Sequence, residues 1–320
     1  MSNIHLILVT YNSPKFVELT LKTLGESTSH PFDITIVDNA SEVETIDVIK
    51  NFKLTKNIGQ INNIFLEENI GYGGAINLAY EKRKDYDFVV PINSDLVFSK
   101  GWLTKMTLEM EKDRKIGLLG PLSPVQFCKH PYSQKDTRQF MMEIGELEDP
   151  KSELDSFIFG KSWDRFVKDL IEDNYSRESL MYFQGPPSHI MGFCYMARSL
   201  AIEDAGGLVH PDFFFGGDDT DLSWRMQKKD YKLAVTRNVY IHHFKHRSFR
   251  ENNVAHAALF KKLSFTFYKK WKSTIEEFLR KEVKSGKNVD KMMKEEDYYD
   301  YWVLRRLNDH VKFWNRNKLN

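Results

Sequence analysis

Short apolar runs recur along the first part of the chain, and each one ends in a group of polar residues. Continuous apolar runs of this kind predict strands that are buried on both faces, as in a parallel sheet. The segments between them carry apolar residues at helical spacing, and Pro14 after Ser13 is typical of a helix start. The predicted strands are 4–9, 34–37, 63–66 and 88–92. Alternation of strand and helix predicts an α/β fold with a mostly parallel central sheet and flanking helices, similar to a Rossmann fold.

Polar residues follow directly after each of these predicted strands. The four groups are Thr10, Tyr11 and Asn12; Asp38, Asn39, Ala40 and Ser41; Asn69, Gly71, Tyr72 and Gly73; and Asn93, Ser94 and Asp95. Because open parallel sheets bind ligands outside the carboxyl ends of their strands, we expect the four groups to converge on one site. The glycine-rich turn is not followed by the Gly-Lys-Ser/Thr of a phosphate-binding P-loop.

The pattern is less regular in the middle of the chain. A predicted helix over 102–112 and a predicted strand over 116–119 precede a charged segment, about 122–180, with weak periodicity. Long irregular segments inside a compact domain are usually functional loops or small inserts. We therefore predict a partly helical lid or acceptor-side insert.

Apolar runs return after this segment. They predict a strand-like stretch over 188–197, a short helix over 200–205, and short strands over 233–236 and 239–241. His242 and His243 end the last strand, and because neighbours on a strand face opposite ways, only one of them points toward the site; we favour His242. Helical spacing from about residue 251 divides the chain into an α/β domain, 1–250, and a C-terminal helical region, 251–320.

Three carboxylates, Asp218, Asp219 and Asp221, follow the pair Gly216-Gly217 at a predicted helix start. Carboxylates are favourable there because unpaired N–H groups and the positive end of the helix dipole lie at a helix N-terminus. Neighbouring carboxylates also suit acid–base chemistry, since like charges raise a pKa. The spacing alone leaves both interpretations open.

Composition narrows the class of protein. The 320 residues are 41% hydrophobic, enough for a large core, and Lys+Arg 46 against Asp+Glu 45 gives a net charge of +1, which favours no nucleic-acid partner. Cys128 and Cys194 form neither a disulfide framework nor a metal-binding spacing, as expected for reduced thiols. No apolar run approaches the roughly 18 residues of a membrane-spanning helix, and Met1 to Ile7 lacks the pattern of a secretion signal. We expect a cytoplasmic protein, soluble or attached peripherally to the inner face of the cell membrane.

The motifs in this order resemble those of a family two glycosyltransferase with the GT-A fold, in particular its bacterial rhamnosyltransferase-like branch. The resemblance rests on the four polar groups, on Gly206-Gly207-Leu208, on Gly217 to Leu222 with Arg225, and on His242-His243. It covers residues 1–250 and implies that they bind a nucleotide-sugar and carry the catalytic site. The implied reaction is inverting transfer of a hexose or deoxyhexose, in polysaccharide biosynthesis, from a UDP- or dTDP-sugar to a hydroxyl of a glycan, glycolipid or protein.

The resemblance also implies roles for individual residues. Asp219 is the base that takes the proton from the acceptor hydroxyl, and Asp218 shapes the site. Asp221 lies on another face of the predicted helix start, so we expect it to be a helix cap. Asp95, with His242 or His243, holds a divalent metal ion (Mn²⁺ or Mg²⁺) at the diphosphate. Asn93 replaces the first carboxylate of the family's metal motif, which lowers the expected metal affinity. The implied contacts to the nucleotide-sugar are Thr10, Tyr11, Asn12, Asp38, Asn69, Gly71, Tyr72, Gly73, Asn93 and Ser94.

Two other functions are compatible with such a fold. A sugar nucleotidyltransferase normally has a glycine-rich N-terminal loop with a basic residue, which Leu8 to Asn12 does not provide. A non-catalytic glycan- or nucleotide-sugar-binding module has no need of the pair Asp218 and Asp219. Basic and aromatic residues over 260–272 leave three roles open for the C-terminal helices: packing on their own domain, a homodimer contact, or a peripheral membrane contact.

Overall fold

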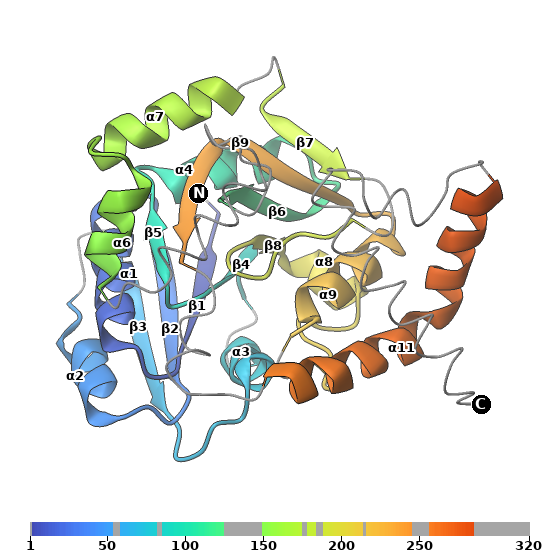
Figure 1. Cartoon of the computed structure of the whole chain (residues 1–320), viewed down its shortest axis with the longest axis horizontal. Helices are drawn as coiled ribbons and strands as arrows, with labels where there is room; N and C mark the ends of the chain where they lie inside the picture. Colours follow the sequence, from blue (N-terminus) through green and yellow to red (C-terminus); the bar gives the residue numbers. More distant parts are fainter. Residues whose placement is uncertain are drawn as a thin grey trace.

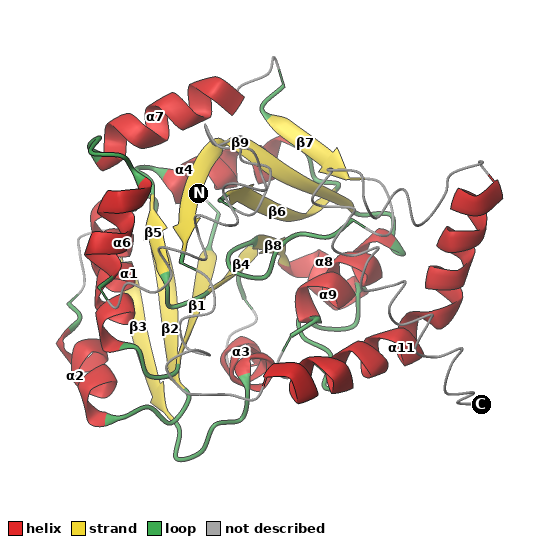
Figure 2. Cartoon of the chain, in the orientation of Figure 1, coloured by secondary structure: helices red, strands yellow, loops and turns green. Residues whose placement is uncertain are grey.

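Strands and helices alternate along the chain and build one central sheet with helices on both faces (Figures 1 and 2). The computed structural model describes residues 2–53, 58–81, 85–124, 149–174, 178–183, 188–213, 216–244 and 256–284. The strands are β1 (Ile4–Thr10), β2 (Phe32–Asp38), β3 (Ile58–Phe65), β4 (Phe88–Ile92), β5 (Leu96–Phe98), β6 (Ile116–Leu122), β7 (Leu180–Phe183), β8 (Met196–Arg198) and β9 (Lys232–His243). The helices are α1 (Pro14–Ser27), α2 (Val43–Asn51), α3 (Tyr72–Glu81), α4 (Trp102–Lys112), α6 (Pro150–Phe157), α7 (Trp163–Asn174), α8 (Ser199–Asp204), α9 (Asp218–Gln227) and α11 (His256–Lys284).

The strand order explains why the polar groups meet. The order is β3-β2-β1-β4-β8-β6-β9-β5, with β7 beside β9. The strands β3, β2, β1 and β4 are all parallel, so their carboxyl ends lie at one edge of the sheet. Antiparallel pairing enters where β8 lies between β4 and β6, and where β5 pairs with β9. The predicted α/β fold is confirmed.

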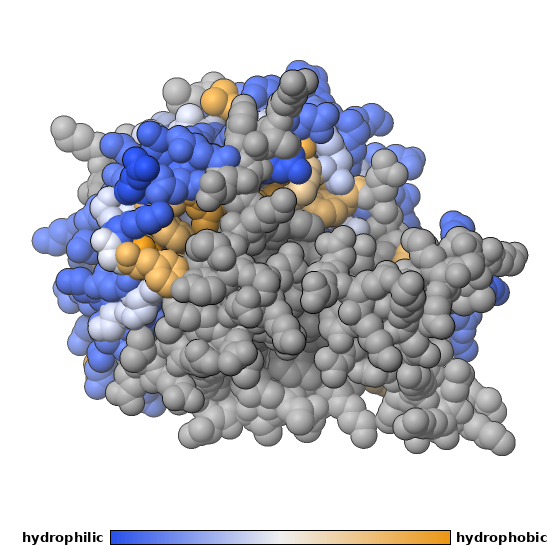
Figure 3. Space-filling model, turned by 45° about the horizontal axis from the view of Figure 1, so that its top comes forward, coloured by the Kyte–Doolittle hydropathy of each residue, from blue (hydrophilic) through white to orange (hydrophobic). Residues whose placement is uncertain are grey.

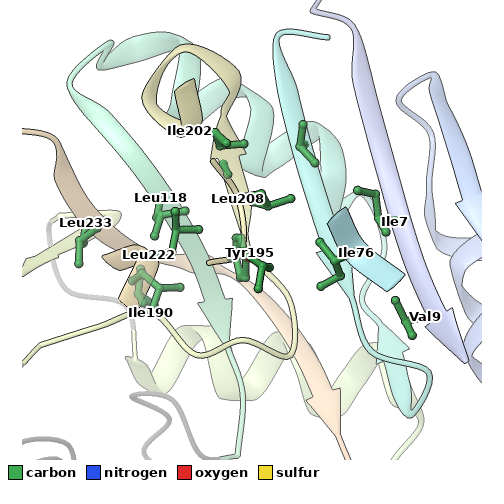
Figure 4. Close-up of a cluster of buried hydrophobic side chains, with 14 of the residues drawn as sticks. Ile7, Val9, Ile76, Leu118, Ile190, Tyr195, Ile202, Leu208, Leu222 and Leu233 are labelled. Carbon is green, nitrogen blue, oxygen red and sulfur yellow. The ribbon is translucent and has the colours of Figure 1, made fainter. Parts of the chain in front are cut away.

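Side chains of β1 alternate between two hydrophobic cores, one on each face of the sheet. Leu6 and Leu8 pack with residues of α1, α2 and α4. Ile7 and Val9 belong to the second core, which also contains Ile76 of α3 and residues of α8 and α9 (Figure 4). Every residue of β1 is buried, as the continuous apolar run predicted. The two cores fix α3 and α9 against the sheet.

The segment predicted as a partly helical insert contains α6 and α7, and residues 125–148 lie outside the described part of the chain. These helices join the second core: the rings of Phe157 and Phe166 pack edge to face at 5.5 Å, and Phe166 contacts Tyr240 of β9 at 5.8 Å. The described part of this segment therefore covers β9.

Three parts of the strand prediction were wrong. The strand predicted over 63–66 begins five residues earlier, because β3 is Ile58–Phe65. The strand-like run over 188–197 is a strand only from Met196; residues before it follow an irregular path, with a single bridge between Ile92 and Cys194. The two short strands after residue 232 are one continuous strand, β9. Its polar interruption at Arg237 and Asn238 coincides with a register shift against β6, since Pro121 pairs with Thr236 and the next residue, Leu122, pairs with Tyr240. A local irregularity of this kind lets a strand continue past residues that do not pair.

The surface shown in Figure 3 is mostly hydrophilic over the described residues, with small hydrophobic patches. None of the helices in the described ranges is both long and apolar enough to cross a membrane. Cys194 is buried and not in a disulfide, in agreement with the sequence, and Cys128 lies outside the described residues. Of the predicted C-terminal helical region, the structure describes α11 and nothing beyond residue 284.

Candidate active site

Thr10 and Asp38 face each other at the ends of β1 and β2, where they are partners in the parallel register. The hydroxyl of Thr10 donates to Asp38 Oδ1 at 2.9 Å, and the backbone N–H of Ser41 donates to Asp38 Oδ2 at 2.9 Å. Both side chains are buried. Each carboxylate oxygen accepts one protein hydrogen bond and retains capacity for a second.

Three asparagines connect the ends of β1, β2 and β3. Asn12 Oδ1 accepts from the N–H of Glu42 at 2.8 Å, and the Asn12 N–H donates to Ser41 Oγ at 2.8 Å. Asn39 Nδ2 donates to Asn69 Oδ1 at 2.8 Å. Asn12 has a φ of 53°, a left-handed conformation that asparagine tolerates well. These hydrogen bonds connect the strand ends that were predicted to line the nucleotide pocket. Tyr11, in the same turn as Asn12, is half-buried.

The glycine turn places Tyr72 at the first position of α3. Gly71 has a φ of 80°, and its N–H donates to Asn69 Oδ1 at 2.9 Å, while Gly73 is buried in the first turn. The Tyr72 hydroxyl donates weakly, at 3.4 Å, to the carbonyl oxygen of Gly192. Burial, followed by the neighbouring Tyr195 and Asp218, raises the pKa of Tyr72 well above its ordinary value. Tyr72 is therefore a neutral phenol that connects the glycine turn to residue 192.

Asp95 and His243 lie side by side at the ends of β4 and β9. His243 Nε2 is 3.3 Å from Asp95 Oδ1 and 3.3 Å from Asn93 Nδ2. Both the Asp95 and the His243 side chains are 10% exposed. Backbone contacts hold this arrangement, since the N–H of Phe244 donates to the Asp95 carbonyl at 3.1 Å and the Ser94 carbonyl accepts from Thr20 Oγ1 at 2.9 Å.

His243, and not the favoured His242, faces Asp95. The two residues pair with Leu96 and Val97 on β5, so strand alternation sends their side chains to opposite faces. The His242 ring is fully buried, packs edge-on against Phe157 at 4.5 Å, and lies with Nδ1 3.2 Å from the Tyr240 hydroxyl. His242 belongs to an aromatic cluster behind the site, which corrects the interpretation drawn from the sequence.

The residues around Asp95 and His243 fit a divalent cation. A carboxylate oxygen and an imidazole nitrogen are suitable ligands for Mn²⁺, and two ligands at about 2.1 Å from an ion and at right angles lie roughly 3 Å apart. That value is close to the observed separation of 3.3 Å. Among the described residues, no group of three or more His, Cys, Asp or Glu side chains is arranged as a complete metal site. A cation here therefore needs further ligands, and phosphate oxygens are of the right kind.

Asp218 and Asp219 begin α9, directly after two glycines with positive φ, Gly216 (129°) and Gly217 (80°). Asp219 Oδ1 accepts from the N–H of Thr220 at 2.7 Å, and Asp219 Oδ2 accepts from the N–H of Gly192 at 2.9 Å. Asp218 is buried; this burial, together with the neighbouring Asp219 charge, raises the pKa of Asp218 to about 8. At neutral pH the Asp218 carboxyl is therefore largely protonated.

Gly192 and Phe193 join the carboxylate pair to the Asp95–His243 pair. The N–H of Gly192 bonds Asp219, the Phe193 carbonyl accepts from the N–H of Asn93 at 2.8 Å, and the Phe193 ring stacks on His243 at 5.0 Å. Ser223, one turn after Asp219, accepts from the N–H of Ile190 at 3.0 Å, so α9 holds this segment twice. The sequence interpretation missed the roles of Gly192 and Phe193. A glycine interrupting an apolar run was the available signal.

Asp221 is not a helix cap. Its carboxylate is fully buried, pairs with Arg225 at 2.7 Å, and accepts from the indole N–H of Trp271 at 2.9 Å. Arg225 also donates to the carbonyl oxygens of Ala205 and Gly207 at 2.8 and 2.6 Å. The capping role predicted for Asp221 is therefore replaced by a contact to α11.

Comparison with solved structures shows the same fold in known glycosyltransferases. The mannosyltransferase PcManGT from Pyrobaculum calidifontis, in complex with GDP-Man and Mn²⁺, has a TM-score of 0.53 and 14% identity, over 98% of this chain and 75% of that one. GalNAc-T7 with UDP, GalNAc and Mn²⁺ has a TM-score of 0.51 and 13% identity, over 76% of this chain. The aligned part spans 44% of the GalNAc-T7 chain. Comparison with curated proteins gave no match.

The polar groups at the strand ends lie within the segment that carries a family signature. The model of glycosyl transferase family 2 matches residues 5–169, which is more than half of the 320 residues. The GT-A fold expected from the motifs agrees with the two structural relatives. The chain belongs to glycosyl transferase family 2.

Proposed function

We propose that this chain is an inverting glycosyltransferase that moves a sugar from a nucleoside-diphosphate donor to a hydroxyl of an acceptor. The observation that carries the proposal is the segment Gly192–Phe193, which connects a carboxylate suited to be a base with a pair of residues suited to hold a cation. A single displacement at an anomeric carbon is assisted by both, the base at the attacking hydroxyl and the cation at the leaving diphosphate.

In the proposed reaction, Asp219 accepts the proton of the acceptor hydroxyl while the hydroxyl oxygen bonds the anomeric carbon of the donor sugar. The bond from that carbon to the diphosphate oxygen breaks, and the nucleoside diphosphate leaves. Two hydrogen bonds fix the Asp219 carboxylate, and protonated Asp218 keeps a second full charge away from it. When bound, a divalent cation supplies charge neutralisation at the leaving diphosphate; Asp95 and His243 would hold it.

The donor is proposed to lie along the strand ends. Asp38 is oriented to accept hydrogen bonds from a base or ribose, and the glycine turn at Gly71 allows close approach of backbone to the ligand. UDP- and dTDP-sugars are the donors favoured by the motifs, and the two structural relatives add support for a nucleotide-sugar, since one binds UDP and the other GDP-Man. Glycan, glycolipid and protein hydroxyls are the acceptor classes to test.

The test starts with donor identification. Thermal shift of the wild-type protein is measured with UDP-, dTDP- and GDP-sugars, each with and without Mn²⁺, because a ligand that binds only the folded state raises the melting temperature. The donor that stabilises the fold is then used in hydrolysis and transfer assays. We expect Asp219→Asn and Asp95→Ala to abolish turnover.

The exposed carboxylate Asp155 on α6 provides the matched control, and Asp155→Asn should turn over like wild type. Near-normal turnover of Asp219→Asn and Asp95→Ala would refute the site assignment. Donor binding without hydrolysis or transfer across all acceptor classes would instead indicate a binding module.

A further inference from the structure

The C-terminal helix α11 packs against α9, the helix that begins with Asp218 and Asp219 (Figure 1). Trp271 of α11 is 4% exposed and its ring lies edge-on to Trp224 of α9 at 5.3 Å. Phe267, one turn earlier, lies edge-on to Trp224 at 5.1 Å, and Lys228 Nζ is 4.6 Å from the Trp271 ring centroid. These contacts make an aromatic seam between the two helices.

Asp221 is the polar centre of this seam. Its carboxylate is fully buried and accepts hydrogen bonds from Arg225 Nε on Oδ2 at 2.7 Å and from Trp271 Nε1 on Oδ1 at 2.9 Å. Lys270 Nζ forms an ion pair with Oδ1 at 2.7 Å. Two of these three partners of Asp221 therefore come from α11. A buried carboxylate is stable only when it is paired and hydrogen-bonded. The Asp221 carboxylate on α9 therefore has all of its partners only while α11 is packed against α9.

The turn before the carboxylate pair is also covered by α11. A side chain added at Gly216 would meet Leu263 at 3.8 Å, and one added at Gly217 would meet Phe267 at 3.9 Å. Both glycines have positive φ, so this turn is held in a conformation that few residues adopt. Since Asp219 is the second residue after this turn, a shift of the turn moves the proposed base relative to Gly192.

We propose that Asp221, together with Trp271 and Lys270, forms a positioning device through which α11 sets the place of Asp219. The catalytic consequence rests on the proposed function; the mechanical coupling between α11 and the first turn of α9 does not. The members of the device touch no reacting atom and act through the position of the α9 N-terminus.

The variants are chosen to remove single partners of Asp221 while keeping the packing. Trp271→Phe removes the indole N–H and retains an aromatic ring against Trp224, and Lys270→Met removes the charge and retains the aliphatic stem. Lys270→Arg keeps the charge and serves as the conservative rescue. Lys269→Met is the matched control, because Lys269 is the exposed neighbour on the same helix.

Two measurements are made on the full chain. Amide hydrogen exchange of residues 216–223, without any substrate, reports local opening of the α9 start. We expect faster exchange in Trp271→Phe and Lys270→Met and wild-type exchange in Lys270→Arg and Lys269→Met. In transfer assays we expect kcat to fall about 10- to 100-fold in the first two variants with donor KM unchanged, because a small misplacement of a reacting group costs this much.

Unchanged exchange over 216–223 in Trp271→Phe and Lys270→Met would overturn the coupling. Faster exchange with wild-type kcat would overturn the positioning role. A rise in donor KM with unchanged kcat would do the same, since it would place the effect in donor binding. If the wild-type chain transfers no sugar, the proposed function fails on its own, and the exchange measurement still decides the coupling.

Discussion

The backbone N–H of Gly192 donates to the carboxylate of Asp219 at 2.9 Å, across the boundary between an irregular segment and the start of α9. The close approach depends on the missing side chain, because a Cβ at residue 192 would lie 3.1 Å from Asp219 Cβ and 3.2 Å from Oδ2. Gly192 is not among the residues with positive φ, so alanine fits its backbone. The glycine is therefore needed for space beside Asp219.

We predict that Gly192→Ala lowers kcat about 10- to 100-fold, because the added methyl group displaces the proposed base. Steady-state kinetics with the identified donor measure the effect. Gly101→Ala is the control: its added Cβ meets nothing within 4 Å, but its φ of 71° makes the substitution strained and destabilising far from the site. Equal losses of kcat in the two variants would show that Gly192→Ala acts through stability alone.

Asp218 should make the stability of the fold depend on pH. Its pKa is raised from an ordinary value near 3.9 to about 8, so the folded state retains a proton that the unfolded state has lost across this window. The stabilisation is complete below about pH 4 and is lost as pH rises through about 8, with a slope of at most about 1.4 kcal/mol per pH unit.

Asp218→Asn lacks this dependence, so its free energy of unfolding should rise relative to wild type between pH 4 and pH 8 and then level off. Urea denaturation at several pH values measures the difference, with Asp155→Asn as an exposed control. Parallel profiles for Asp218→Asn and wild type would contradict a raised pKa at Asp218.

The two histidines at the end of β9 should separate metal binding from folding. His243→Ala removes a proposed metal ligand, so we expect the Mn²⁺ concentration for half-maximal transfer to rise by about 10-fold or more. Loss of a residue that only supports a metal ligand already lowers metal affinity about 10- to 100-fold. His242→Ala empties a buried position against Phe157 and Phe244, and we expect a loss of about 2–4 kcal/mol in stability. Titration of Mn²⁺ and urea denaturation of both variants measure the two effects. A raised Mn²⁺ requirement in His242→Ala with wild-type stability would reverse the assignment.

The parallel strands β1, β2 and β4 could be predicted from the sequence because they are buried on both faces, so most of their residues are apolar. The edge strand β3 is largely exposed, and its start was not predicted. The polar groups of the site could be located from the sequence because each of them comes after the end of a predicted strand. The face presented by His243 could not be predicted, because it depends on the pairing of β9 with β5, two strands that lie far apart in the sequence. Asp221 was assigned as a cap because its partners Lys270 and Trp271 lie on a helix about 50 residues further on.

Gly192 and Phe193 were missed for a different reason. Their contacts to Asp219 and Asn93 are made by backbone N–H and carbonyl groups, which every residue type carries. The apolar run around them was interpreted as a strand, whereas Gly192 bonds a carboxylate and Phe193 is linked to the end of β4. Backbone contacts of this kind leave no residue pattern beyond the glycine itself.

Asn93 offers a test of how charge sets metal affinity at the site. Its N–H is held by the Phe193 carbonyl at 2.8 Å whatever the side chain, and Nδ2 lies 3.3 Å from His243 Nε2. Asn93→Asp therefore places a second carboxylate next to Asp95 without moving the backbone. We predict two opposite effects on the melting temperature: a decrease without metal, because like charges repel, and a larger increase on adding Mn²⁺. A tenfold gain in Mn²⁺ affinity corresponds to about 1.4 kcal/mol.

Thermal shift with and without Mn²⁺ measures both effects, and Asn51→Asp, at the exposed end of α2, controls for the added charge. A Mn²⁺-induced shift no larger than that of wild type would mean that the residue at position 93 does not face the cation, and would leave Asp95 and His243 as the protein ligands in the proposed site. A larger shift in Asn93→Asp alone would place residue 93 beside the ion and would explain a weak metal requirement in the natural sequence by its missing charge.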